Sequence, residues 1–557
     1  MKSKSEPDHV IVAVQPHKDS VRETVESIVV AFILAFLFRT FEAEAFVIPT
    51  GSMAPTLMGQ HEDVYCPECG YRYQVGEPET PSRGPSWGTC PNCRFRCKLK
   101  VIEETRDRRG LVEVEGDLDY IAPSYKGDRI IVSKFPYEFN DPRRWDVAVF
   151  KYPATAKTNF IKRIVGLPRE TLHIFHGDVL TRPDGATDFR TARKPPDKVL
   201  AMLQPVYDND YCQPQLIALG LPPRWSSATN GQGAWRPTDD GKSFEYTGAD
   251  AREAWLRYEH RIPDARDWEA IVADPRSAQT RAQLERIAPQ LIVDFCAYDT
   301  GRDDYRGLFW VGDLAVECEL DVRSVAKSGA TAGEVSLELV EGGRAFRCRI
   351  ELDTGIATLS ADDLPEFHPR GRTDVRPGTR HRLRLANVDN QLLLWVDDRT
   401  VQFDSSTEYE LPWHSYTDRD YAPAGIAVRG ASARVSHLRL LRDVYYTAAQ
   451  NFGGKNTTDD QFLPEGSATP IEFVLRDGQF LMLGDNSPKS KDSRLWNRTD
   501  AQGRPEYYVS RDLLIGKAMF VYWPHAWAPE WAIPLRLGGM TLYLPSYPDF
   551  QRMRFIR

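Results

Sequence analysis

Residues 28–38 form an uninterrupted apolar run near the N-terminus, and this run constrains the fold more than any other part of the sequence. A spanning helix usually needs roughly 20 apolar residues, and the run extends from Thr24 to Phe41 as a helix about 27 Å long. Charged residues near both ends can reach the membrane interface. A buried core helix and a cleavable leader are the alternatives, but no small-residue cleavage site follows the run. We expect segment 21–45 to be a transmembrane anchor.

The distribution of basic residues predicts how this anchor is oriented. Four Lys or Arg residues precede the run, whereas only Arg39 follows it before Arg72. This excess predicts that a short tail, residues 1–20, stays in the cytoplasm and that the bulk of the chain lies outside. The net charge of −8 argues against a nucleic-acid partner. Membrane lipid is the partner that the anchor predicts.

Alternation of apolar and polar residues predicts strands along most of the remaining chain. It is clear in residues 127–135 and 145–151, and again in residues 314–322 and 392–396. Many short strands separated by Gly- or Asp-rich turns are typical of a β-sandwich. We expect the piece 200–447 to be such a sandwich, folding independently and taking no part in the chemistry.

Four cysteines predict a metal site between the anchor and these strands. They form two C-x2-C pairs separated by 20 residues, which is typical of a tetrahedral zinc site in a zinc ribbon spanning 66–97. On an oxidising face of a membrane the same residues would instead form two disulfides, and the sequence leaves both open. A Cys318–Cys348 disulfide is also open. The zinc ligands would be Cys66, Cys69, Cys90 and Cys93.

Three segments carry the residues that suit chemistry. Ser52 lies in a turn flanked by Gly and Pro, Lys162 lies in an apolar run, and residues 484–494 form a polar turn. A serine hydroxyl is a weak nucleophile unless a base takes its proton. No G-x-S-x-G elbow and no histidine triad context is present. A lysine is the available base, provided that burial lowers its pKa and keeps it neutral.

Three segments resemble the motifs of bacterial type I signal peptidases, both in their order along the chain and in their residues. They are Pro49–Pro55, Phe160–Pro168 and Gly484–Arg494. These Ser/Lys proteases remove signal peptides from exported preproteins without a cofactor. The resemblance implies that Ser52 is the nucleophile and Lys162 the general base. It also implies an oxyanion hole formed by the Thr50 hydroxyl and the Ser52 backbone N–H. It further implies that Ser490 orients the lysine amine. Asp492 and Arg494 would form a supporting ion pair.

The resemblance further implies that a signal peptide binds as an extended strand along a sheet edge. Shallow pockets would then select small residues before the cut. The pocket-lining positions are apolar, and each is equally suited to ordinary core packing. They are Ile48, Met53, Leu57, Phe160 and Ile161.

The predicted fold is mainly β. A signal-peptidase-like all-β catalytic domain follows the transmembrane helix, and it is divided into residues 46–65, 98–199 and 448–557. The inserted zinc ribbon, 66–97, and the inserted sandwich, 200–447, interrupt it. The sandwich pattern resembles concanavalin-like jelly-roll domains, which by analogy suggests a carbohydrate or protein ligand.

The function expected from these patterns is a serine endopeptidase that is anchored in the bacterial inner membrane. It would have one span, a cytoplasmic N-terminus and a catalytic domain on the outer side. A self-cleaving Ser/Lys protease is one alternative. A membrane-tethered binding or scaffold protein, using the ribbon and the sandwich beside an inactive core, is another. The anchor and residues 484–494 favour the first, and the intact Ser52 and Lys162 argue against an inactive core.

Overall fold

The computed structural model describes most of the chain between residues 24 and 557. The described residues are 24–33, 43–77, 86–99, 124–228, 234–248, 252–300, 307–325, 333–447, 450–452, 455–457, 472–496, 498–499, 503, 506–524, 526–527, 533–537, 540–544 and 547–557.

Only part of the expected anchor lies within the described residues. Residues 24–33 are helical and exposed, whereas the 1–20 tail and residues 34–42 lie outside the described ranges. Among the helices of the described residues, none combines the length and the apolar character that a bilayer crossing requires.

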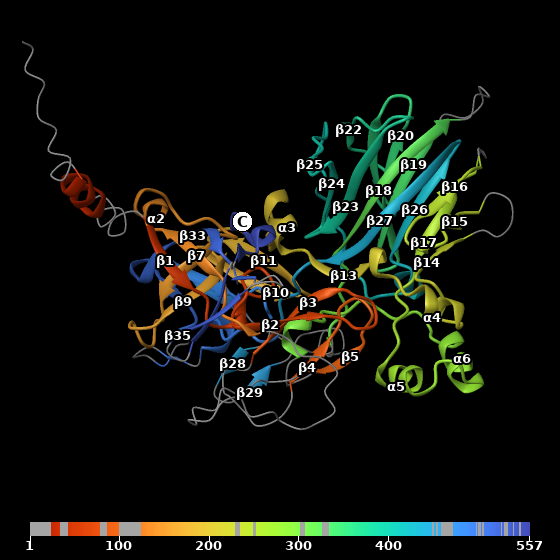
Figure 1. Cartoon of the computed structure of the whole chain (residues 1–557). Coiled ribbons are helices and arrows are strands. Elements are labelled where there is room, and N and C mark those ends of the chain that lie inside the picture. Colours follow the sequence, from red (N-terminus) through yellow and green to blue (C-terminus); the bar gives the residue numbers. More distant parts are fainter. Residues whose placement is uncertain are drawn as a thin grey trace, which may run out of the picture.

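Two antiparallel sheets, with strands from both ends of the chain, form one part of the molecule. We call this part the Ser52 lobe. In spatial order, the seven-stranded sheet is β1 (Ala43–Val47), β7 (Arg129–Ser133), β33 (Leu514–Trp523), β8 (Val147–Lys151), β9 (Asn159–Gly166), β31 (Gln479–Leu483) and β32 (Val509–Ser510). The four-stranded sheet is β12 (Arg190–Thr191), β11 (Asp178–Pro183), β10 (Glu170–Phe175) and β30 (Glu472–Leu475). β33, from near the C-terminus, lies between β7 and β8, so strands that the sandwich separates in the chain share one sheet (Figure 1).

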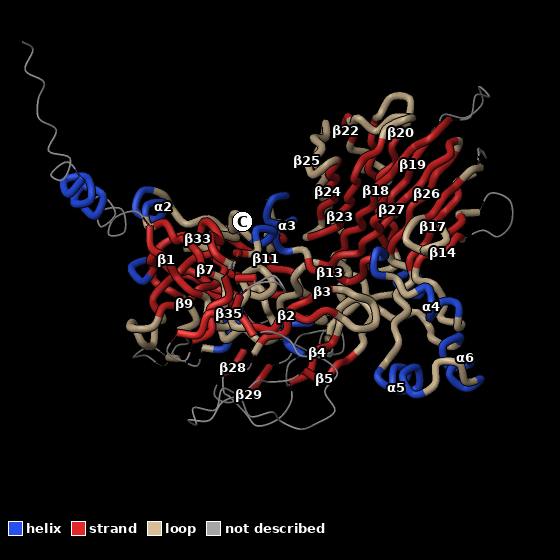
Figure 2. Tube along the Cα trace, in the orientation of Figure 1, coloured by secondary structure: helices blue, strands red, loops and turns tan. Residues whose placement is uncertain are grey.

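Strand alternation explains how this sheet is buried. On β7, Ile130 and Val132 are fully buried, and they pack with Val147 and Val149 of β8. Their neighbours along each strand face the other side of the sheet, as a period of two requires. The expectation of a mainly β fold is confirmed, because strands dominate both halves of the molecule and helices are short and peripheral (Figure 2).

The second half of the molecule is a β-sandwich of two antiparallel sheets. One sheet is β15 (Arg236–Pro237), β16 (Phe244–Tyr246), β27 (Ala431–Arg442), β18 (Leu314–Val325), β23 (Arg380–Val388), β24 (Gln391–Val396) and β25 (Arg399–Thr400), with β13 (Gln204–Asp208) also paired to β27. The other is β14 (Trp225–Ser227), β17 (Ala254–Tyr258), β26 (Ala424–Arg429), β19 (Glu334–Glu341), β20 (Arg344–Glu351), β21 (Ile356–Ala361) and β22 (Arg370–Arg372). One apolar core joins the sheets, and it contains Cys318 of β18 and Cys348 of β20 as free thiols.

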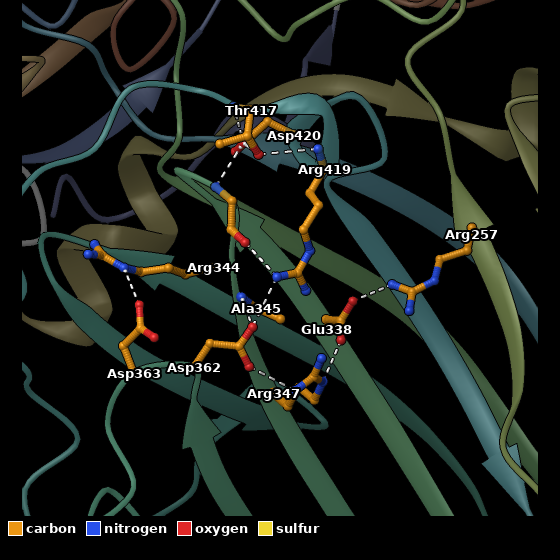
Figure 3. Close-up of polar contacts among 11 residues, drawn as sticks. Arg257, Glu338, Arg344, Ala345, Arg347, Asp362, Asp363, Thr417, Arg419 and Asp420 are labelled. Carbon is orange, nitrogen blue, oxygen red and sulfur yellow. Dashed lines mark hydrogen bonds and ion pairs between the residues drawn. The ribbon is translucent and has the colours of Figure 1, made fainter.

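The outer face of the second sheet carries a charge network. Glu338 of β19 is held between Arg257 of β17 and Arg347 of β20 (Figure 3). Arg347 also pairs with Asp362 at 3.2 Å, and Arg419 reaches the same carboxylate at 3.1 Å. The arginines are a quarter to a half exposed, so this network lies at the solvent boundary.

The cysteine-rich region and several short elements lie beside these lobes. The hairpins are β2 (His61–Tyr65) with β3 (Arg72–Gly76) and β6 (Ser124–Tyr125), and β4 (Ser86–Thr89) with β5 (Arg96–Leu99). The helices are α2 (Phe135–Phe139), α3 (Pro196–Met202), α4 (Pro214–Ala218), α5 (Ala265–Ala273) and α6 (Ala278–Glu285). The remaining strand pairs are β28 (Gln450–Phe452) with β29 (Lys455–Thr457), β34 (Ala526–Trp527) with β37 (Tyr547–Pro548), and β35 (Ile533–Leu537) with β36 (Met540–Leu544).

Buried contacts join the insertions to each other and to the Ser52 lobe. The four cysteines of the hairpins pack in one apolar cluster with Trp268 of α5 and Leu284 of α6. Lys194, after β12, pairs with Asp389 at 2.5 Å and with Asp443 at 2.8 Å, and all three side chains are almost fully buried. A buried charge is tolerated only when it is paired in this way, so these contacts fix the sandwich against the Ser52 lobe.

Candidate active site

Ser52 is presented by a three-residue 3-10 turn, η1 (Gly51–Met53). The N–H of Ala54 donates to the carbonyl of Gly51 at 2.9 Å, and the N–H of Leu57 donates to the carbonyl of Met53 at 2.9 Å. Met53, Ala54 and Leu57 are fully buried. Because the chain after Ser52 is anchored in the core, the turn holds the serine side chain in a fixed place.

The structure brings Lys162 of β9 to this serine. Lys162 Nζ lies 2.6 Å from Ser52 Oγ and 3.0 Å from the carbonyl oxygen of Ile161. The amine lies 5.4 Å from the centre of the Phe160 ring. Lys162 is only 4% exposed, so the amine is largely shielded from water. The two residues are 110 positions apart in the chain, and the sheet places them in hydrogen-bond contact.

The polar turn 484–494 is folded around a buried ion pair. Arg494 donates to Asp492 through Nε at 2.9 Å and through Nη2 at 2.7 Å. Asp492 also accepts the N–H of Gly484 at 3.0 Å, while Arg494 Nη1 donates to Ser487 Oγ at 2.9 Å. Such a pair satisfies its own charges and rigidifies the turn.

Ser490 is fully buried next to the turn that carries Ser52. A Cβ added at Gly484 would lie 2.1 Å from Ser490 Oγ and 2.3 Å from the carbonyl oxygen of Ser52, so only glycine fits there. Within the described part of the chain, Ser490 Oγ has no hydrogen-bond partner. Its role in orienting Lys162 therefore stays a prediction.

The residues expected to line a substrate pocket lie in two apolar clusters. Ile48, Met53, Leu57 and Ile161 are buried together in the core of the seven-stranded sheet. Phe160 is half-buried and stacks on Tyr152, with ring centres 4.5 Å apart. Thr50 precedes the turn in extended conformation, and its side chain makes no capping hydrogen bond. The substrate and oxyanion roles of these residues stay predictions.

A buried ion pair next to Lys162 was not anticipated from the sequence. Arg163 donates to Asp485 through Nε at 2.7 Å and through Nη2 at 2.6 Å, and both side chains are fully buried. Thr56 Oγ1 donates to Asp485 Oδ2 at 2.5 Å. Burial alone would lower the pKa of Arg163, but the Asp485 carboxylate more than offsets this and raises it. Arg163 and Asp485 lie within the segments Phe160–Pro168 and Gly484–Arg494. Their place in these two segments is the only sequence feature that points to the pair.

Hydrogen bonds of Asn486 connect the Ser52 turn, the polar turn 484–494 and Asp299 of the piece 200–447. Its backbone N–H donates to the Ser52 carbonyl at 3.2 Å, and its Nδ2 donates to the Gly51 carbonyl at 3.2 Å. Nδ2 also donates to Asp299 Oδ1 at 2.7 Å. Asp299 belongs to the piece 200–447, so this piece contacts the polar turn that holds Ser52. The expectation that it takes no part in the chemistry stays a prediction. No local sequence pattern indicated this contact.

The four cysteines form a compact cluster that could hold a metal ion. Two Sγ–Sγ distances are 3.5 and 3.6 Å, and all four sulfurs lie within 4.8 Å of one another. A zinc ion with bonds of about 2.3 Å needs sulfurs about 3.8 Å apart. The two turns match: Gly70 donates to the Cys66 carbonyl at 2.8 Å and Arg94 to the Cys90 carbonyl at 2.9 Å, both with positive φ. All four thiols are free, and this donor set fits zinc.

Comparison with known proteins connects this site to one family. The family model described as signal peptidase, peptidase S26, matches residues 121–200 and 418–523. Signal peptidase I of Leptolyngbya laminosa is 45% identical over 60 residues, which is 10% of this chain and 30% of that protein. Signal peptidase I of Pseudomonas fluorescens is 43% identical over 58 residues, 8% of this chain and 20% of that protein. These matches support the signal peptidase family.

The extent of these matches is limited. The chain matches less than a third of the length of either relative. The family model covers Lys162 and the polar turn 484–494, whereas Ser52 precedes the matched residues.

Solved structures similar to this chain include two with carbohydrate-related names. The carbohydrate binding module CBM66 from Bacillus subtilis is 10% identical, covering 39% of this chain and 94% of that chain, with a TM-score of 0.21. The carbohydrate recognition domain of Emp46p is 12% identical, covering 39% and 88%, with a TM-score of 0.22. These likenesses are weak, and the sandwich is defined by its own two sheets and their shared core.

Proposed function

We propose that this chain is a serine endopeptidase that removes N-terminal signal peptides from exported preproteins. The distance of 2.6 Å between Lys162 Nζ and Ser52 Oγ, with Lys162 only 4% exposed, carries this proposal. A hydroxyl next to a buried amine is the arrangement that lets a neutral lysine act as the base. The family-model match and the signal peptidase I relatives support the same reaction class.

In the proposed mechanism the Lys162 amine is neutral, because its burial disfavours the charged form. The amine takes the Ser52 proton as Oγ attacks the scissile carbonyl carbon. The oxyanion accepts hydrogen bonds from the Ser52 N–H and the Thr50 hydroxyl. Lys162 then gives the proton to the leaving amine. It next takes a proton from the water that attacks the acyl-enzyme, and it gives this proton to Ser52 Oγ as the acyl–Oγ bond breaks. The amine is then neutral again.

The surrounding buried groups would hold the two reacting side chains in register. The carbonyl of Ile161, 3.0 Å from the amine, directs Lys162 toward Ser52. Ser490 Oγ is buried and has no hydrogen-bond partner among the described residues. It would accept a second hydrogen bond from the Lys162 amine. The Asp492–Arg494 pair keeps the 484–494 turn in shape.

The substrate would bind as an extended strand beside the nucleophile turn. Ile48, Met53, Leu57, Phe160 and Ile161 would shape shallow apolar pockets, which favour small side chains. The reaction would take place outside the bacterial inner membrane, with segment 21–45 as a single anchor and lipid as its surroundings. The sandwich would add a surface for a carbohydrate or protein ligand.

A decisive experiment is cleavage of a purified preprotein by the full chain in detergent micelles. Ser52→Ala and Lys162→Ala should each lower kcat by at least about 10⁴-fold, and the double variant should lose no more than either alone. Lys151→Ala, on the exposed end of the neighbouring strand β8, is the matched control and should cleave like the wild type. Substantial cleavage by Lys162→Ala would remove the assigned base.

The same assay separates the alternatives. A scaffold protein would leave the preprotein intact at every enzyme concentration. A self-cleaving protease would shorten itself while it leaves the preprotein intact.

Zinc in the cysteine cluster would be structural. Metal analysis should find about one zinc per chain in the wild type, and substantially less when Cys66 and Cys90 are both replaced by Ser. Mass spectrometry that shows Cys66–Cys69 and Cys90–Cys93 disulfides, together with no zinc, would reject the metal.

A further inference from the structure

A short segment of the insertion reaches the nucleophile turn. It consists of Cys296 and the 3-10 turn η3 (Ala297–Thr300), between β17 and β18 of the sandwich, and we call it the 296–300 segment. It lies more than 240 residues after Ser52 in the chain. Contacts from three of its side chains meet at the Ser52 turn.

Tyr298 packs directly against the backbone of the nucleophile turn. A Cβ added at Gly51 would lie 1.9 Å from Tyr298 Cε1, and one added at Gly76 would lie 2.1 Å from the same atom. Both positions are therefore glycines because the ring occupies the space of a side chain. The Tyr298 hydroxyl donates to the Gln60 carbonyl at 2.9 Å, which fixes the ring in this place.

An apolar cluster supports the same contact. Cys296 and Tyr298 pack with Ala54 and Met58, which follow Ser52 on the buried side of its turn. Met58 and Ala54 are nearly or fully buried. The chain after the serine is thus fixed against the insertion as well as against the core of its own sheet.

Asp299 acts on the turn through one amide. Its Oδ1 accepts a hydrogen bond from Asn486 Nδ2 at 2.7 Å, and the same nitrogen donates to the Gly51 carbonyl at 3.2 Å. The backbone N–H of Asn486 holds the Ser52 carbonyl. The Asp299 carboxylate can only accept hydrogen bonds, so the Asn486 amide must turn its Nδ2 rather than its Oδ1 toward it. This fixes the orientation of the amide group.

Thr300 connects the segment to the cysteine-rich region. The N–H of Thr89, one residue before Cys90, donates to Thr300 Oγ1 at 3.1 Å. Thr300 Oγ1 in turn donates to the Ala297 carbonyl at 2.8 Å. The cysteine-rich region is therefore bonded to the same segment that packs against the Ser52 turn.

We propose that the 296–300 segment holds Ser52 in its reactive position relative to Lys162, with Tyr298 and Asp299 as positioning residues and Asn486 as the link. The sandwich insertion is then a structural requirement for catalysis. This inference rests on the proposed peptidase function. It concerns the placement of Ser52, since neither Tyr298 nor Asp299 takes part in bond making.

Peptide cleavage by the full chain in detergent tests the inference. Asp299→Ala should lower kcat by about 10- to 100-fold with KM changed less than about twofold, because a small misplacement of a reacting group has effects of this size. Asp299→Asn keeps an acceptor oxygen and should restore kcat to within about threefold of the wild type. Asp353→Ala, an exposed aspartate in a sandwich turn, is the control and should have no effect.

A double variant checks the route through Asn486. Asn486→Ala alone should lower kcat, and adding Asp299→Ala to it should lower kcat less than about twofold further, since both remove the same connection. Equal kcat for Asp299→Ala and the control, or effects of the two substitutions that multiply, would overturn the inference.

Hydrogen exchange gives a readout that does not depend on cleavage. Backbone amides within residues 48–58 should exchange faster in Asp299→Ala than in the wild type or the Asp353→Ala control. Unchanged exchange would overturn the inference even if the enzyme is active. If the wild type cleaves no signal peptide but exchange in this segment still increases, the proposed function fails and the placement of the turn by the insertion remains supported. Tyr298→Phe, which loses only the bond to Gln60, should increase exchange by a smaller amount in the same segment.

Discussion

The Ser52 lobe and the sandwich both contain arginine–carboxylate networks, and these differ in their exposure to water. Arg163 and Asp485 beside the active site are fully buried and joined by two hydrogen bonds. On the sandwich, Glu338 is 2% exposed but its arginine partners are 27% and 34% exposed, and the outer pair of Arg419 and Asp362 is 49% and 33% exposed (Figure 3). A buried pair that loses one partner leaves an uncompensated charge in the interior, whereas an exposed pair loses only a screened attraction. The buried Arg163–Asp485 pair therefore adds rigidity at the site, whereas the exposed Arg419–Asp362 pair adds little to stability.

The two regions also differ in what holds their backbones. The sandwich depends on consecutive hairpins with alternating apolar side chains, such as β19 paired with β20 over eight residue pairs. The Ser52 turn is held in addition by single polar contacts from Asn486, a residue far away in the chain that is itself bonded to Asp299. Loss of one contact should therefore disturb the backbone of the sandwich little, and it should disturb the Ser52 turn strongly.

The largest expected effect on stability comes from breaking the buried pair. Asp485→Ala leaves Arg163 without its carboxylate and Thr56 without its acceptor, and should destabilise the Ser52 lobe by about 3–5 kcal/mol. Urea unfolding, followed separately for the two lobes by hydrogen exchange, measures this change. A loss below about 1 kcal/mol would mean that the site pair behaves like a surface pair, and the contrast between the regions would not hold.

The sequence predicted the sandwich because its determinants are local. Period-two patterns such as residues 314–322 lie within single strands, and their burial follows directly. It also placed Ser52 and Lys162 in recognisable motifs, and the structure brings the two side chains into contact. It did not indicate that Arg163 meets Asp485, because the two are 322 positions apart and charge alone does not select a partner. The position of Tyr298 over Gly51 was equally hidden, because glycine is common in turns whether or not an aromatic ring packs against it.

Asp299 is an intermediate case, a carboxylate that is largely shielded but has an amide rather than an arginine as its partner. Burial raises the pKa of Asp299 to about 6, and the nearby Asp294 carboxylate also raises it. The hydrogen bonds from Asn486 and Cys296 and the charge of Lys489 lower it, but they do not offset the burial. Because the folded state holds this proton more tightly than the unfolded chain, stability falls as pH rises from about 4 to about 6 and the cost persists above it.

Asp299→Asn should remove that cost. The variant should be more stable than the wild type at pH 7, and the difference should disappear below about pH 4, where both side chains are neutral. Thermal unfolding across this range, with the exposed Asp353→Asn as control, measures the effect. A wild type that is more stable than Asp299→Asn at pH 7 would show that the carboxylate is stabilised by its surroundings like that of Asp485.

The smallest expected effect comes from the sandwich surface. Asp363 is 66% exposed and pairs with Arg344 at 3.1 Å (Figure 3). Its φ of 65° is tolerated by asparagine, so Asp363→Asn removes the charge without straining the backbone. The variant should lose less than about 1 kcal/mol of stability, and the loss should become smaller as salt screens the pair. Urea unfolding at low and high salt measures it. A loss comparable to that of Asp485→Ala, unaffected by salt, would show that the sandwich network is coupled to the core and that exposure does not explain the difference between the two regions.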